Sequence, residues 1–188
     1  MIYPICPYGD PVLRKVSVDI PKDFDIKKLS EDMFETMYEA QGVGLAAPQV
    51  GLNWRFFVVD GTPMNEGEKP KDIDKSLIDF KKTFVNPIIV EEYGKEWAFE
   101  EGCLSIPGIR YDVFRPEFVK IKYFDLDWVE REEVYNGLAA RIIQHEYDHI
   151  EGVLFTDYLN PVKRRMLKNK LTDISKGKVS VDYRMKRL

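Results

Sequence analysis

Two histidines and a glutamate stand close together in the segment QHEYDH, residues 144–149, with a spacing typical of metal-dependent hydrolysis. On a helix, His145 and His149 lie on one face, where a single metal ion can bind both imidazoles. Glu146 is next round that face and can exchange a proton with a water molecule without being a ligand. The chain has no other histidine, so a core helix with hydrogen-bonded histidines is the weaker interpretation. Asp148 either orients a ligand or faces solvent.

A third ligand is needed, because catalytic metal sites usually take three protein ligands and leave one position open. With no third histidine, it must be a thiolate or a carboxylate. Cys103 stands out in EEGCLSIPG, after a glycine and before a Pro-Gly pair, in what is expected to be a loop. A free cysteine is more often a buried apolar side chain, and Cys6 receives that interpretation. The residues alone leave the third ligand open.

Hydrophobic periodicity and stop signals outline the elements that must position these residues. Helices are predicted over 25–41, 138–150 and 161–177, and strands over 54–60, 83–90 and 117–125, while the segment 131–137 ends in an Asn-Gly turn signal. The segment GVGLAAPQVGLN, residues 42–53, is expected to be irregular and to let backbone approach closely. Both histidines share a stripe of the second helix, so this helix is the predicted carrier of the metal.

The predicted elements indicate an α+β fold, with mixed or antiparallel strands packed around the central metal-binding helix and with N-terminal and C-terminal helices. A length of 188 residues with 44% hydrophobic content suits a single domain, 1–188. Residues 61–82 are polar and interrupted by Gly and Pro, so we expect a surface insert there. The tail, 176–188, is expected to be an edge strand or disordered.

Charge and composition exclude several classes of function. The net charge of −4 comes from interspersed acidic and basic residues, so sequence-specific or phosphate-based nucleic-acid binding is not expected. No segment is apolar enough to span a bilayer, and no export signal is recognisable at the N-terminus. A cytoplasmic protein without membrane contact and with two free thiols is therefore expected.

Three segments resemble the signature motifs of the peptide deformylase family and occur in the same order. They are GVGLAAPQ (42–49), EGCLS (101–105) and QHEYDH (144–149). YGDPVLR (8–14) and LFTDYLNP (154–161) are also similar to that family, so the resemblance covers most of the chain. It implies an enzyme that removes the formyl group from the N-terminal formylmethionine of newly synthesised proteins and releases formate.

The resemblance implies a metal held by Cys103, His145 and His149, with a water in the fourth position. Ferrous iron would be the native metal, and nickel, cobalt or zinc would substitute for it. A thiolate ligand suits a soft divalent metal and leaves the site open to oxidation. The sequence itself does not choose among these metals.

The same resemblance assigns roles around the metal. Glu146 would carry the proton, and the oxyanion would accept hydrogen bonds from the Gln49 side-chain amide and the backbone N–H of Leu104. The backbone of Gly44 would pair with the extended substrate, an N-formylmethionyl nascent peptide. Without the resemblance, Gln49 would be interpreted as an exposed loop amide and Gly44 as part of a tight turn.

An apolar pocket is required for the methionine side chain. Candidates that flank the motifs or precede the histidines are Val43, Phe99, Leu138 and Ile142. Two features depart from the family pattern: the length of the 61–82 insert, and Arg141, which stands where an apolar residue would be expected. Arg141 would either pair with a carboxylate or face solvent.

The basic run KRRMLKNK, 163–170, suggests ribosome contact through the C-terminal helix, although a solvated helix face is the favoured interpretation. Two rival functions also remain. A zinc endopeptidase would take Asp173 as its third ligand. A structural zinc site in a binding module would add Cys6 as a fourth ligand, although a core of this size folds without metal.

Overall fold

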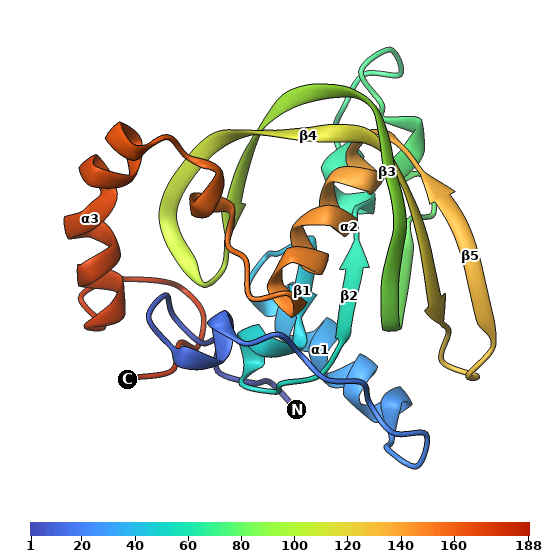
Figure 1. The fold of residues 1–188 in the computed structure, drawn as a ribbon, viewed down its shortest axis with the longest axis horizontal. Helices are drawn as coiled ribbons and strands as arrows, with labels where there is room; N and C mark the ends of the chain where they lie inside the picture. Colours follow the sequence, from blue (N-terminus) through green and yellow to red (C-terminus); the bar gives the residue numbers. More distant parts are fainter.

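An antiparallel sheet wraps around one central helix in the computed structural model, which describes residues 1–188 (Figure 1). Its five strands follow the chain in the order β1-β2-β3-β4-β5. They are β1 (Gly44–Ala46), β2 (Phe56–Asp60), β3 (Lys81–Cys103), β4 (Ile106–Phe124) and β5 (Glu130–Tyr135). The helices are α1 (Ile26–Glu39), α2 (Gly137–Ile150) and α3 (Pro161–Ser175). The predicted α+β class and all three predicted helices are confirmed.

β3 and β4 form a hairpin much longer than the two short strands that apolar periodicity predicted. Residues 91–100 are mostly exposed and half of them are charged, so they give little hydrophobic signal, yet backbone pairing with β4 continues through them. Register shifts interrupt the pairing at four places, and such bulges bend a strand. The hairpin arches over α2 (Figure 1). Cys103, expected in a loop, is the last residue of β3, beside the turn made by Leu104 and Ser105.

The segment 42–53, expected to be irregular, contains β1 and a turn of 3-10 helix, Ala47–Val50. That expectation was wrong because small residues also allow a strand to lie against a helix. A Cβ at Gly44 would lie 2.7 Å from Cδ and 2.9 Å from Cγ of Glu146, and closer still to Oε1. Only glycine lets β1 come this close to α2.

The insert 61–82 is less of a surface loop than its composition suggested. Leu77 is fully buried and Phe80 is 3% exposed, both in the core cluster around α2. Asp74 Oδ2 accepts the N–H of Leu138 at 3.1 Å, and Ser76 Oγ accepts the N–H of Ala139 at 3.0 Å. Asn136 makes no side-chain cap, so the insert itself caps α2.

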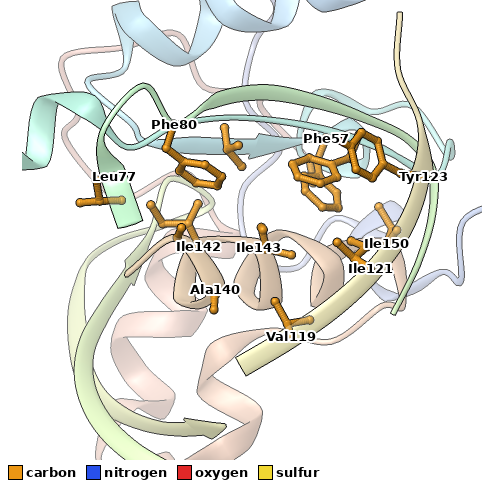
Figure 2. Packing of buried hydrophobic residues seen from close by; sticks show 14 residues of the cluster. Phe57, Leu77, Phe80, Val119, Ile121, Tyr123, Ala140, Ile142, Ile143 and Ile150 are labelled. Carbon is orange, nitrogen blue, oxygen red and sulfur yellow. The ribbon is translucent and has the colours of Figure 1, made fainter. Parts of the chain in front are cut away.

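The apolar residues of α2 fix the helix beneath the sheet. Ile142 and Ile143 point from α2 towards Phe80 and Phe57 (Figure 2). The cluster contains fourteen buried residues from the insert, β1 to β4 and α2. Close packing of this kind holds the polar side chains of α2 in one orientation.

Residues 176–188, expected to be an edge strand or disordered, are docked against the N-terminal segment. The N–H of Ile5 donates to the carbonyl of Arg184 at 2.9 Å, and the N–H of Lys186 donates to the carbonyl of Ile5 at 2.8 Å. These bonds form one parallel bridge, between Ile5 and Met185, rather than a strand. None of the helices combines the length and apolar character needed to cross a membrane.

Candidate metal centre

Cys103, His145 and His149 meet where the end of β3 lies against α2. One possible ligand atom from each residue lies within 4.8 Å of the others, and Cys103 Sγ is 3.3 Å from His149 Nε2. A sulfur and two imidazole nitrogens form a donor set that suits a borderline or soft divalent cation. Three protein ligands leave a coordination position for a water or a substrate atom. These residues therefore fit a catalytic metal ion.

A cavity of about 890 Å³ opens beside this cluster. Its lining includes Cys103, His145 and Glu146. His149 is 1% exposed and lies behind the cavity wall. The other residues predicted from the sequence also line the cavity: Val43, Gly44, Gln49, Phe99, Leu104, Leu138 and Ile142. The structure thus brings all of the predicted site residues to one place.

Glu146 occupies a buried position beside the cluster, in the wall of the cavity. It is 4% exposed, and its Oε2 has no hydrogen-bond partner. Burial raises the pKa of Glu146 to about 7, while the neighbouring His145 opposes the rise. A buried carboxylate with a free oxygen and a pKa near neutrality can accept and return a proton.

Gln49 is oriented by its own backbone neighbourhood. Its Oε1 accepts the N–H of Ala46 at 2.9 Å, which directs Nε2 the other way. Nε2 lies 3.4 Å from Cys103 Sγ and 3.3 Å from Ser105 Oγ. At 2% exposure, Gln49 is a buried donor beside the cluster rather than an exposed loop amide.

Sequence reasoning missed Glu101, which organises the layer behind the ligands. Its carboxylate contacts His145 Nδ1 at 2.9 Å and accepts from Arg115 Nε at 2.7 Å and Nη2 at 2.9 Å. Burial alone would raise the pKa of Glu101. The hydrogen bonds from Arg115 and His145 outweigh this effect and hold the pKa well below its usual range. A carboxylate on the second ring nitrogen fixes the orientation and tautomer of a metal-ligating histidine. Glu101 precedes Cys103 by two residues, and both side chains reach α2 although the pairing of β3 with β4 is irregular between them.

Two arginines complete this layer. Arg141 donates to Glu101 Oε2 at 2.8 Å and stacks on the ring of Trp97. Of the two alternatives predicted for Arg141, the structure therefore shows the pairing with a carboxylate. Arg115 also donates to Asp148 Oδ2 at 2.8 Å. Asp148 therefore acts on the ligands only indirectly, through Arg115 and Glu101.

Comparisons with known proteins identify the family of this chain. A family model described as polypeptide deformylase matches residues 2–165. The chain is 58% identical to a peptide deformylase of Cytophaga hutchinsonii over 187 residues, covering 99% of this chain and 97% of that protein. It is 55% identical to a peptide deformylase of Flavobacterium johnsoniae, covering 99% of this chain and 96% of that protein.

Solved structures give the same result. The crystal structure of peptide deformylase from Thermus thermophilus matches with a TM-score of 0.80 and 38% identity, over 93% of this chain and 98% of that one. Peptide deformylase from Ehrlichia chaffeensis matches with a TM-score of 0.81 and 34% identity, over 92% of this chain and 96% of that one. The chain belongs to the peptide deformylase family, whose metal-dependent enzymes remove the N-formyl group from nascent peptides.

Proposed function

We propose that Cys103, His145 and His149 hold the metal ion in this member of the family, and that Glu146 is its catalytic acid and base. The observation that carries the proposal is the convergence of one thiol and two imidazoles within 4.8 Å, beside a buried carboxylate with a free oxygen. A divalent cation bound there supplies Lewis acidity, which polarises the formyl carbonyl and makes water more acidic.

The residues around the cluster divide the remaining work. Glu146 takes a proton from the attacking water and returns it to the amine nitrogen as the C–N bond of the formamide breaks. The Nε2 group of Gln49 and the N–H of Leu104 donate to the oxygen that becomes negatively charged. Leu104 N–H suits this task because it makes no hydrogen bond within the chain. The products are formate and a free amino terminus.

The N-formylmethionyl peptide binds in an extended conformation along β1. This strand is at the edge of the sheet, so Gly44 has a strand partner on one side only. The methionine side chain enters the apolar part of the cavity lined by Val43, Phe99, Leu138 and Ile142. If Ile142→Asp left KM for a formyl-Met peptide unchanged, Ile142 would not belong to this pocket.

The ligand set can be tested against both rival sites. We expect Cys103→Ala to lose the metal and the release of formate, while Asp173→Ala and Cys6→Ser keep both. A zinc endopeptidase predicts the reverse for Cys103 and Asp173, and a closed structural site predicts unfolding of Cys6→Ser. Metal content by elemental analysis, formate release and thermal unfolding of the three variants distinguish these outcomes.

We further propose ferrous iron as the native metal, with nickel, cobalt and zinc as substitutes. The support is chemical: a thiolate beside two imidazoles suits a soft divalent ion that oxygen can inactivate. Protein purified without oxygen should contain about one iron per chain, and stoichiometric zinc under the same conditions would contradict the proposal.

We also propose that the enzyme acts in the cytoplasm and meets nascent chains at the ribosome through α3. Arg164, Arg165, Lys168 and Lys170 are exposed on this helix. Their contact with ribosomal RNA would weaken steeply with salt, because each phosphate contact releases counterions. The double substitution Arg164→Glu and Arg165→Glu should abolish co-sedimentation with ribosomes, and unchanged co-sedimentation would leave α3 as a solvated face.

A further inference from the structure

Tyr183 reaches the active site from the tail, far from every motif in the sequence. Its hydroxyl donates to the carbonyl oxygen of Leu104 at 2.6 Å, and its side chain lines the cavity beside the metal ligands. Leu104 lies in the two-residue turn between β3 and β4, directly after Cys103. One side chain of the tail is therefore hydrogen-bonded to the turn that contains the proposed oxyanion donor and directly follows a proposed metal ligand.

This turn is held from three directions. The N–H of Tyr8 donates to the carbonyl of Ser105 at 2.8 Å, and Gln49 Nε2 lies 3.3 Å from Ser105 Oγ. The Tyr183 hydroxyl donates a hydrogen bond to the Leu104 carbonyl, while the Leu104 N–H makes no hydrogen bond within the chain. A peptide group fixed on its carbonyl side, next to an N–H that is free, is what a preorganised donor requires.

The docking of the tail explains how Tyr183 is placed. Backbone hydrogen bonds join Ile5 to Arg184 and Lys186, and Lys186 Nζ lies 2.8 Å from Asp10 Oδ2. Cys6, which follows Ile5 in the chain, donates its N–H to the carbonyl of Gln49 at 2.7 Å. The N-terminal segment thus links the tail directly to the second proposed oxyanion donor.

We propose that Tyr183 is a positioning residue: its hydroxyl fixes the peptide between Leu104 and Ser105 and keeps the Leu104 N–H directed at the substrate oxygen. This inference rests on the proposed role of the Leu104 N–H. The matched family model ends at residue 165, so the tail lies outside the part of the chain that it describes.

The test compares Tyr183→Phe with wild type in the full chain, both loaded with nickel and assayed on a formyl-Met-Ala peptide. Phenylalanine keeps the ring in the cavity wall and removes only the hydroxyl. We expect kcat to fall about fivefold to tenfold with KM within about twofold, because a positioning hydrogen bond is lost while substrate contacts remain.

Tyr93→Phe is the matched control. Tyr93 is 39% exposed and stacks on Phe118 in the hairpin, and its hydroxyl has no hydrogen-bond partner. This variant should keep the kcat and KM of wild type. A similar loss in both variants would mean that the assay reports general destabilisation, and the proposal would be overturned.

Amide hydrogen exchange of residues 103–106 in the metal-free protein gives a readout independent of activity. Tyr183→Phe should speed exchange in this turn, and Tyr93→Phe should not. The proposal is overturned if Tyr183→Phe leaves both kcat and exchange unchanged, or if it raises KM alone. If wild type itself releases no formate, the proposed function fails, and the exchange data still decide whether Tyr183 holds the turn.

Discussion

Replacing Gly44 with alanine should damage catalysis through a single added methyl group. The new Cβ would lie 2.7 Å from the carboxyl carbon of Glu146, whereas ordinary contact begins at 3.4 Å, so that carbon must retreat by about 0.7 Å. Misplacing a catalytic group by about 1 Å can cost about 100-fold, so we expect kcat/KM for a formyl-Met peptide to fall about 30-fold. Backbone pairing with the substrate remains possible because alanine keeps both backbone groups.

A double-mutant cycle tests the physical reason. In a Glu146→Ala background the clashing Cγ, Cδ and Oε1 atoms are absent, so Gly44→Ala should lower the residual kcat/KM by less than about threefold there. Gly67→Ala serves as the control: a Cβ at Gly67 meets nothing within 4 Å, and although its φ of +78° makes alanine cost stability, kcat/KM should not change. A Gly44→Ala enzyme with wild-type kcat/KM, or one that loses as much in the Glu146→Ala background, would refute the steric reasoning.

The remaining predictions concern the layers around the site. Glu101→Gln should lower the free energy of unfolding of the metal-free protein by about 3–5 kcal/mol in urea titrations, because it leaves the buried guanidinium of Arg115 without its main counter-charge. The same substitution should weaken metal binding about 10-fold to 100-fold. Asp74→Ala should cost about 1 kcal/mol of stability, through the lost cap on α2, while kcat is unchanged. Although burial opposes it, the Lys186 ammonium and neighbouring donors hold the pKa of Asp10 below 3.8. The stabilisation by this pair is therefore fully present above the pKa that Asp10 has in the unfolded chain. It is lost as pH falls through the lower pKa that Asp10 has in the folded protein. The difference in melting temperature between wild type and Asp10→Asn should be constant at neutral pH and shrink as pH falls below 3.8.

Helix α2 could be predicted because its signals are local. Helical periodicity, the spacing of His145 and His149, and the adjacent Glu146 all lie within residues 138–150. The bounds of α2, Gly137–Ile150, differ from that prediction by one residue. Local chemistry of this kind needs no knowledge of the rest of the fold.

The support around that helix could not be predicted from local patterns. Glu101 reaches His145 only because β3 continues through exposed residues, where pairing with β4 rather than hydrophobicity sustains the strand. Asp74 caps a helix that begins over sixty residues later, and Tyr183 reaches a turn seventy-nine residues earlier. Such contacts depend on tertiary packing, for which the sequence of either partner gives no separate signal.

The most direct test of the account is formate release from a formyl-Met-Ala peptide by protein prepared without oxygen and loaded with iron or nickel. Wild type should release formate. Glu146→Gln should release it about 100-fold more slowly or worse, with the same metal content and melting behaviour as wild type. The reason is that glutamine keeps the shape of the side chain but cannot carry the proton. Equal rates from the two proteins, or no formate from folded and metal-loaded wild type, would contradict the account.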